Sequence, residues 1–250
     1  MKYGLIAAGQ GSRLVADGIT TPKPLIQVGG ETLLGRLCRI FCENGAESIS
    51  VIINEEMREV YDYIMKIKLP IPLNLVVKST PDSFHSFCEL MPFLQEKKVD
   101  TGVEYGKDGL DSNGKFCLTT IDPIFQEKEF ASYIRRFQED DEHDALMGVT
   151  DYIDDEKPLY VKTDAETLQI TGYANESYEG CRFISGGIYC MNQQALALLL
   201  EAKEAGVQRM RGFQQYLVDA GLKLQAWAFS KVIDIDHAAD IEVAERLLAK

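Results

Sequence analysis

Hydrophobic and polar positions along the chain form blocks that predict a regular succession of strands and helices. Short apolar runs predict strands at residues 2–8, 48–54, 73–77, 116–121 and 144–150. Between them, apolar residues recur at helical spacing at residues 31–46, 55–68, 83–94 and 130–137. This alternation predicts an α/β fold, a doubly wound and mostly parallel sheet with helices on both faces.

The pattern changes in the second half of the chain, beyond a polar stretch at 99–115. Strands joined by short turns, without helices between them, are predicted at 159–163, 168–173 and 181–192. Such a section predicts a small antiparallel insertion beside the main sheet. Two helices, a strand at 224–229 and a helix from Ala238 complete the chain. Because there is no internal repeat and no Pro/Ser-rich linker, we expect one domain over residues 1–250.

The composition is ordinary for a globular protein, with 46% hydrophobic and 26% charged residues among 250. No apolar run approaches the ~20 residues that span a bilayer, and the first residues do not resemble a signal peptide. We therefore expect a cytoplasmic protein without a membrane partner. The six cysteines form no CxxC pair, which favours buried thiols in a reducing compartment.

The charge is distributed unevenly. The formal net charge is −13, which argues against a nucleic-acid partner because such a partner requires a basic surface. Residues 1–41 nevertheless carry five basic and two acidic side chains. This local excess indicates that a small anionic ligand binds near the N-terminus. The sequence leaves homo-oligomerisation open.

A glycine-containing loop, AAGQGSR at residues 7–13, follows the first predicted strand. Glycine lets backbone N–H groups approach phosphate oxygens closely. The dinucleotide-binding fingerprint requires a third glycine where this chain has Leu14. The P-loop requires Lys-Ser/Thr directly after its last glycine, where this chain has Ser12 and Arg13. Neither motif fits the loop.

The longer stretch LIAAGQGSRL…TPKPL resembles the N-terminal signature of the sugar-phosphate nucleotidyltransferases, also called NDP-sugar pyrophosphorylases. Arg13 and Lys23 are ten residues apart, as in that family. The resemblance implies a Rossmann-like, GT-A-like nucleotidyltransferase fold. It also implies transfer of NMP from an NTP to a phosphate monoester, with a sugar 1-phosphate as the expected acceptor and an NDP-sugar and pyrophosphate as products.

This chemistry explains the residue types in the loop. Two anions must meet, so catalysis consists mostly of positioning and charge neutralisation. Arg13 is expected to hold the β- and γ-phosphates through two donors, and Lys23 to neutralise the point where α-phosphate and acceptor phosphate meet. The nucleotide-binding backbone is assigned to Ala8, Gly9, Gly11 and Ser12.

Nucleotidyl transfer usually needs Mg²⁺, which prefers carboxylate oxygens. Asp122 ends a predicted strand where a parallel sheet presents its ligand crevice, although Ile121 replaces the glycine usual in the family. The second candidate pair is Asp234 and Asp236 in VIDIDHAAD, whose side chains point to one side if they end a strand. His237 stands where the family has threonine. Asp240 is expected in the first turn of the last helix.

The residues that would contact the base and the acceptor are less well defined by the sequence. Ser79, Thr80 and Ser83 are candidates for base contact or for capping the following helix. Gly186 and Gly187 in FISGGIYCMN resemble the family's glycine-containing strand beside the acceptor, and Lys162 is a candidate for the acceptor phosphate. The acidic residues around DYIDDE (151–156) are expected to be solvated.

Two rival functions stay open. A cytidylyltransferase acting on phosphocholine or another alcohol phosphate suits the DID segment as well. A catalytically weak nucleotide-binding regulatory protein would account for Ile121 and His237. An NAD-binding domain is disfavoured by the missing third glycine.

Overall fold

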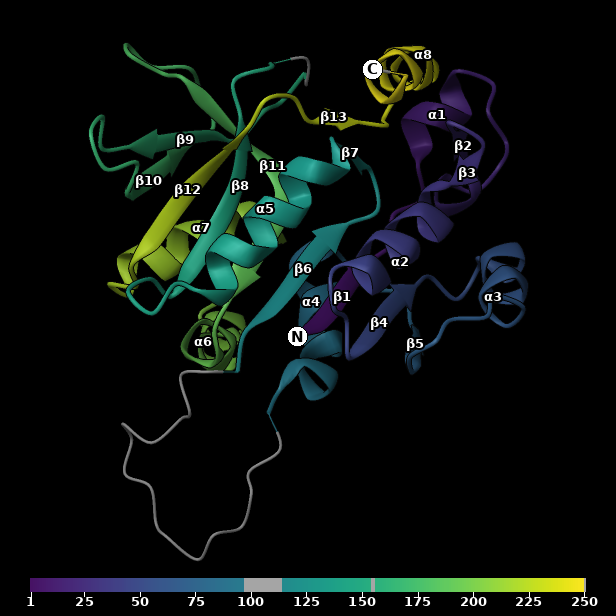
Figure 1. Ribbon diagram of the computed structural model, residues 1–250, viewed down its shortest axis with the longest axis horizontal. Coiled ribbons are helices and arrows are strands. Elements are labelled where there is room, and N and C mark those ends of the chain that lie inside the picture. The colour runs from purple at the N-terminus through teal and green to yellow at the C-terminus, as the bar shows by residue number, and fades with distance from the viewer. Residues whose placement is uncertain (97–113, 154–155, 250) are drawn as a thin grey trace, which may run out of the picture.

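The computed structural model describes residues 1–96, 114–153 and 156–249. Figure 1 shows a central sheet with helices on both of its faces. Most of the polar stretch 99–115, and Asp154 and Asp155 of the acidic stretch, lie outside the described residues. Among the described residues, no helix has the length and apolar character needed to cross a membrane.

The predicted elements are present, with ends that differ by a few residues, and the short helix α1 (Ser12–Ala16) is an element that the sequence pattern did not predict. The strands of the nine-stranded sheet are β1 (Lys2–Ile6), β4 (Ser48–Ile53), β5 (Leu73–Val77), β6 (Phe116–Thr120), β8 (Ala145–Thr150), β9 (Tyr160–Thr163), β10 (Ile170–Ala174), β11 (Phe183–Met191) and β12 (Leu224–Phe229). The α-helices are α1 (Ser12–Ala16), α2 (Leu33–Glu43), α3 (Arg58–Ile64), α4 (Ser83–Leu94), α5 (Glu127–Gln138), α6 (Gln193–Glu204), α7 (Arg209–Asp219) and α8 (Ala238–Leu248).

The first half of the chain forms the parallel part of the sheet. β1 lies between β4 and β6, and β4 also pairs with β5, all in parallel. Ile6 at the end of β1 is level with Ile52 of β4 and Thr120 of β6. The segments that follow these three strands therefore emerge at one edge of the sheet, which is where open α/β sheets bind ligands.

The second half adds the antiparallel part. β11 runs antiparallel to β6, β8 and β9, and β9 runs antiparallel to β10, whereas β12 is parallel to β8. These pairings give seven strands that run in one direction and two, β10 and β11, that run against them. The predicted α/β fold with a mostly parallel sheet and a small antiparallel insertion is confirmed.

A bulge interrupts β11 where the sequence has its two glycines. Ser185 is opposite Val149 of β8, and Tyr189 is opposite Met147. Over this stretch β11 advances by four residues while β8 advances by two, and Gly186 and Gly187 belong to the extra residues of β11. The second glycine has φ of +70°, a conformation that costs little only for glycine. The bulge bends β11 at the carboxyl edge of β6 and β8.

Two hydrophobic cores cover the two faces of the sheet. Alternate residues of β1 serve both: Tyr3 and Leu5 pack with α2 and α5, while Ile6 packs with α4, α6 and α7. The Tyr3 ring stacks on Phe41 of α2 at a centroid distance of 4.6 Å. Because both faces of β1, β4 and β6 are buried, these strands appear as largely apolar runs in the sequence.

Short elements that the sequence pattern did not predict lie at the edge of the sheet. β7 (Pro123–Ile124) pairs with β13 (Ile233–Asp234), and β2 (Gln27–Val28) pairs with β3 (Glu31–Thr32), both antiparallel. A 3-10 helix, η1, covers Lys23–Leu25. The β7–β13 pair joins the chain that leaves β6 to the chain that enters α8.

Candidate active site

The glycine loop follows β1 at the carboxyl edge of the sheet. The N–H of Ala7 still donates to a carbonyl of β4 (2.9 Å), and the chain then leaves the sheet. Ala8 is half-buried, whereas Gly9 and Ser12 are exposed. Gly11 has φ of +62° and caps α1, a left-handed conformation that favours glycine at this position. The loop is thus open to a ligand on its outer side.

Lys23 passes directly beneath this loop. A Cβ added at Gly11 would lie 3.3 Å from the Lys23 Cβ. The lysine side chain is only 6% exposed, and its Nζ lies 2.7 Å from Asp122 Oδ2 and 2.7 Å from Asp236 Oδ1. Burial alone would lower the pKa of Lys23, but the two carboxylates outweigh it and hold that pKa above its usual value. Lys23 therefore carries its charge at neutral pH.

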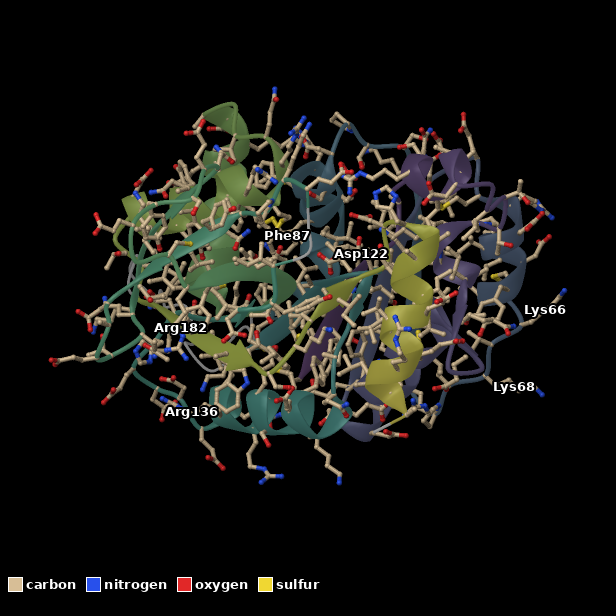
Figure 2. All side chains as sticks on the ribbon, turned by 90° about the horizontal axis from the view of Figure 1, so that it is seen from above. Lys66, Lys68, Phe87, Asp122, Arg136 and Arg182 are labelled. Atoms are coloured by element: carbon tan, nitrogen blue, oxygen red, sulfur yellow. The ribbon has the colours of Figure 1, made fainter. Side chains whose placement is uncertain are left out.

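Asp122 lies between β6 and β7, and its side chain is 22% exposed. Figure 2 shows it near the centre of the molecule, whereas Lys66 and Lys68 lie at the edge. Burial would raise the pKa of Asp122, but the charge and hydrogen bond of Lys23, with a hydrogen bond from Thr120, hold it below its usual value. Asp122 is thus an ionised carboxylate paired with a buried ammonium group.

Backbone pairing brings Asp122 and Asp236 together across the chain. In the β7–β13 region the N–H of Ile235 donates to the carbonyl of Asp122 (3.2 Å). The carboxylate of Asp240 accepts from the backbone N–H groups of Asp236 (2.9 Å) and His237 (2.6 Å). Asp240 thereby fixes the turn that precedes α8, which agrees with its predicted place in the first turn of that helix.

Arg13 completes the charged cluster and borders a pocket. Its guanidinium lies 2.6 Å from Asp236 Oδ2, so Asp236 is shared between Arg13 and Lys23. The pocket beside this pair also contains the candidate residues Asp234 and Gly186. It is lined by Arg13, Thr150, Tyr152, Glu156, Ile184, Ser185, Gly186, Val232, Ile233, Asp234, Asp236, His237 and Asp240.

The remaining acceptor candidates differ in position. Gly187 is next to the end of β6, where a Cβ would lie 2.6 Å from the Thr120 Oγ1. Lys162 does not line the pocket. Its ammonium lies 5.6 Å from the centre of the Tyr178 ring. The structure therefore groups Gly186 and Gly187 with the charged cluster, and leaves Lys162 outside the pocket lining.

The base-contact candidates lie beyond the ends of β4 and β5. Ser79 Oγ donates to Oδ1 of Asn54 (3.1 Å), a 9% exposed residue directly after β4 that the sequence analysis missed. The hydroxyl of Thr80 contacts α4, and that of Ser83 accepts from an N–H of α7. The residue that caps α4 is Asp82, which accepts from a backbone N–H of the first turn (3.0 Å). None of the three candidate hydroxyls therefore caps α4, so the expectation that they cap this helix is wrong.

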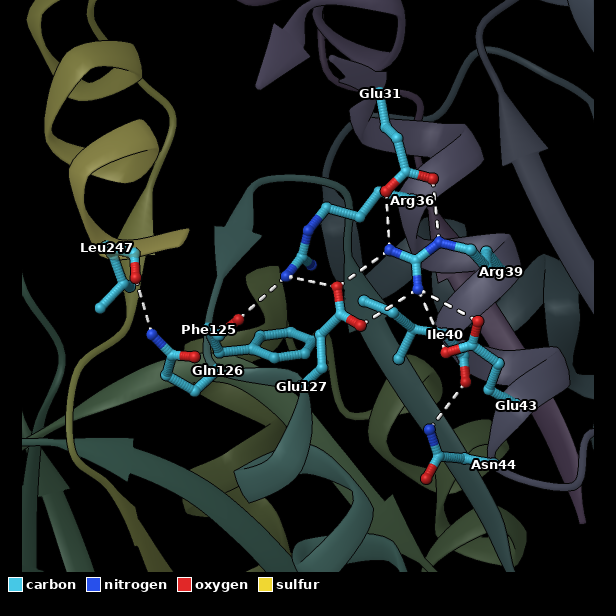
Figure 3. Close-up of polar contacts among 10 residues, drawn as sticks. All are labelled: Glu31, Arg36, Arg39, Ile40, Glu43, Asn44, Phe125, Gln126, Glu127 and Leu247. Atoms are coloured by element: carbon cyan, nitrogen blue, oxygen red, sulfur yellow. Dashed lines mark hydrogen bonds and ion pairs between the residues drawn. The ribbon is translucent and has the colours of Figure 1, made fainter. Parts of the chain in front are cut away.

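A network around two arginines of α2 holds the elements around the site in place (Figure 3). Arg36 of α2, 1% exposed, donates to the carbonyl of Phe125 (3.0 Å) just after β7. Arg39 lies between Glu31 and Glu127, and its hydrogen bonds lower the pKa of both carboxyls. The network fixes α2 against the segment that carries Asp122.

One further carboxylate at the site carried no sequence signal. Asp17, which ends α1, accepts from the His237 Nδ1 and from the backbone N–H of Ala238, both at 3.0 Å. The partners are more than 200 residues apart in sequence. Figure 1 shows the two helices that they join, α1 and α8, close together. The pairing depends on tertiary structure, so no local pattern could reveal it.

Among the described residues, no group of three or more His, Cys, Asp or Glu side chains is arranged to hold a metal ion. The pair Asp122 and Asp236 nevertheless fits one, because each oxygen lies 2.7 Å from the same ammonium nitrogen. These two carboxylates already share a single cation. Mg²⁺ in nucleotide enzymes is commonly held by one or two carboxylates together with substrate phosphates.

The chain belongs to the nucleotidyl transferase family, whose model matches residues 4–235. That match begins within β1 and includes the glycine loop, Lys23, Asp122 and β13, so it covers most of the charged cluster described above. The resemblance drawn from the N-terminal signature is thereby confirmed. No curated protein sequence matches the chain significantly.

Solved structures of nucleotidyltransferases share the fold over almost the whole chain. The inositol-1-phosphate CTP transferase from T. maritima superposes with a TM-score of 0.76 at 18% identity, covering 98% of this chain and 95% of that one. A Bacillus anthracis protein described as a glucose-1-phosphate thymidylyltransferase gives 0.79 at 14% identity, with 99% and 94% covered. The CTP:phosphocholine cytidylyltransferase from Streptococcus pneumoniae gives 0.70 at 16% identity, with 99% and 98% covered.

Proposed function

We propose that this protein is a Mg²⁺-dependent nucleotidyltransferase that transfers NMP from an NTP to a phosphate monoester and releases pyrophosphate. The observation that carries the proposal is the buried Lys23, shared by two carboxylates beneath the glycine loop and next to Arg13. A fixed positive charge at this edge of the sheet suits a reaction that brings two phosphate groups together.

We propose the following roles for the residues of the site. The backbone of residues 8–12 would receive the triphosphate, and Arg13 would bind its β- and γ-phosphates. Lys23 would neutralise the α-phosphate as the acceptor attacks in line, without a covalent enzyme intermediate. Asp122 and Asp236 would hold Mg²⁺, and the ion would supply positive charge for the phosphates. Asp234 lines the same pocket and is a further candidate ligand.

The acceptor would enter from the antiparallel half. Gly186 borders the pocket and Gly187 lies beside the end of β6, so the bulge in β11 leaves room next to the charged cluster. A sugar 1-phosphate is our first candidate. The alternative, an alcohol phosphate used by a cytidylyltransferase, is favoured by two structural neighbours that act on inositol 1-phosphate and phosphocholine.

Pyrophosphate release tests the proposal. Each NTP would be combined with Mg²⁺ and with sugar 1-phosphates, inositol 1-phosphate or phosphocholine. Arg13→Ala and Asp122→Asn are the test variants. Their controls are Arg58→Ala, at an arginine whose side chain is 80% exposed, and Asp141→Asn, at an aspartate that is 86% exposed.

We expect release with one NTP and acceptor pair, a loss of at least about 100-fold in both test variants, and no loss in the controls. Full activity in Arg13→Ala would contradict the assigned leaving-group role. NTP binding without release for any acceptor, and without Mg²⁺ dependence, would instead support the regulatory alternative.

A further inference from the structure

The protein has three histidines, and each places its Nδ1 about 3 Å from an aspartate. In two of them the aspartate is three positions earlier in the chain (Asp82 for His85, Asp140 for His143). The third pair, His237 with Asp17, joins two distant segments. His237 also lines the pocket beside Arg13. It is one of the two departures from the family pattern seen in the sequence, and the proposed function gives it no role.

Asp17 fixes the orientation of the His237 imidazole. Its Oδ2 accepts from the backbone N–H of Ala238 and faces Nδ1 of His237, both at 3.0 Å. The hydrogen bonds from Ala238 and His237 lower the pKa of Asp17, so its carboxylate only accepts hydrogen bonds at neutral pH. Nδ1 of His237 therefore donates its proton to Asp17, and Nε2 is turned away from Asp17.

The Nε2 atom of His237 is buried, and within the described part of the chain it has no hydrogen-bond partner. A buried polar atom without a partner is uncommon in proteins and costs stability. Oε1 of Glu156 lies 3.7 Å from it, too far for a hydrogen bond. An imidazole nitrogen without a hydrogen-bond partner and a carboxylate oxygen thus lie side by side at the pocket.

We propose that His237 Nε2 and Glu156 Oε1 bind neighbouring hydroxyl groups of the acceptor, with Asp17 as the residue that positions the imidazole. Of two adjacent hydroxyls on one carbon skeleton, one can form a hydrogen bond with the imidazole nitrogen and the other can donate one to the carboxylate. The acceptor is therefore a sugar or polyol phosphate, because phosphocholine has no alcohol hydroxyl to offer to either atom. This inference rests on the proposed function, because it places the acceptor in the pocket beside Arg13.

Binding measurements test this without turnover. The probes are glucose 1-phosphate, inositol 1-phosphate and phosphocholine, titrated calorimetrically into protein saturated with Mg²⁺ and an α,β-methylene NTP analogue, which cannot release pyrophosphate. His237→Ala should raise the Kd of a hydroxyl-bearing probe about tenfold or more. The Kd of the analogue should not change. His143→Ala, which removes a histidine with the same local partner chemistry from another part of the fold, is the matched control.

The role of Asp17 requires a double-mutant cycle. Asp17→Ala should weaken binding of the hydroxyl-bearing probe, and the double variant with His237→Ala should bind it no more weakly than His237→Ala alone. Asp17→Asn keeps an acceptor oxygen and should recover most of the affinity. If the double variant loses affinity by the product of the two single-variant factors, Asp17 does not act through His237.

The other outcomes are also decisive. Equal binding of the sugar and polyol probes by wild type and His237→Ala would overturn the inference, as would phosphocholine binding more tightly than either. If the analogue binds but no hydroxyl-bearing probe does, the inference fails while nucleotide binding stands. If no analogue binds in an Arg13-dependent manner, the proposed function itself fails.

Discussion

Replacing Lys23 by methionine tests the charged cluster most directly. The substitution keeps the length and volume of the buried stem but removes the cation between Asp122 and Asp236. Each carboxylate oxygen lies 2.7 Å from the Lys23 Nζ, so the two oxygens are at most twice that distance apart. At an effective dielectric constant near 20, two negative charges at that spacing repel by about 3 kcal/mol.

Solvent reduces this figure, because the Asp122 and Asp236 side chains are 22% and 32% exposed. We expect Lys23→Met to lose about 2 kcal/mol of unfolding free energy, which corresponds to a Tm lower by roughly 4–8 °C for a chain of this length. Lys78→Met removes a 52% exposed lysine that is paired with Glu89. As the control, it should cost less than about 1 kcal/mol.

The loss should depend on pH in a defined direction. The pKa of Asp122 is lowered in the folded state, so its contribution is present above the unfolded value near 4 and disappears as the pH falls through the folded pKa. The pKa of Lys23 is raised, so its contribution is present below about 10.4 and is lost as the pH rises through the folded value. The difference between wild type and variant should therefore be largest between about pH 5 and 10.

Mg²⁺ supplies the decisive comparison. Two carboxylates without their lysine should bind the ion more tightly, so Mg²⁺ should raise the Tm of Lys23→Met more than that of wild type. An ion at 100 times its Kd contributes about 2.7 kcal/mol. Thermal unfolding with Mg²⁺ or with EDTA measures both effects. An unchanged Tm without metal, together with an equal response to Mg²⁺, would refute the electrostatic account of the cluster.

Two further substitutions test the supporting structure. Gly187→Ala should lower the free energy of unfolding, measured by denaturant titration, by about 2–3 kcal/mol, because the residue has φ of +70° and its new Cβ would meet the Thr120 Oγ1 at 2.6 Å. The control is Gly172→Ala in β10, where the nearest atom lies at 3.6 Å, and it should leave the free energy of unfolding unchanged. Arg39→Gln should lower the free energy of unfolding by about 1 kcal/mol at pH 7 and low salt, since its partners Glu31 and Glu127 are about 40% exposed. That loss should shrink as the pH falls through the lowered pKa of Glu127 in the folded state, because the protonated carboxyl no longer pairs with Arg39. A loss that persists at acid pH would show that Arg39 acts through packing.

The sequence predicts the large elements of this fold well, for physical reasons. β1 and β4 are buried on both faces and appear as apolar runs, and α2 keeps its apolar residues on one face. The order of the strands in the sheet could not be predicted in the same way, as β11 shows. Its place between β6 and β8 depends on long-range pairing, which leaves no trace in the local pattern.

Short elements escaped prediction for a different reason. β7 and β13 have two residues each, too few to show any period, and α1 has five. These pieces form because the rest of the fold holds them, and they carry much of the candidate site. The sequence therefore indicated Arg13, Lys23, Asp122 and Asp236 through a family motif and strand ends. Sequence reasoning did not anticipate that Lys23 bridges the two carboxylates.

The charged cluster also has a consequence for synthesis of the protein on the ribosome. Arg13, Lys23 and Asp122 emerge with the parallel part of the sheet, but their shared partner Asp236 emerges more than a hundred residues after Asp122. Until then Lys23 has one carboxylate instead of two, and Arg13 lacks its 2.6 Å partner. Nascent chains shorter than this point would carry the glycine loop without a completed cluster. The order of translation thus delays assembly of the charged site until β13 can pair with β7.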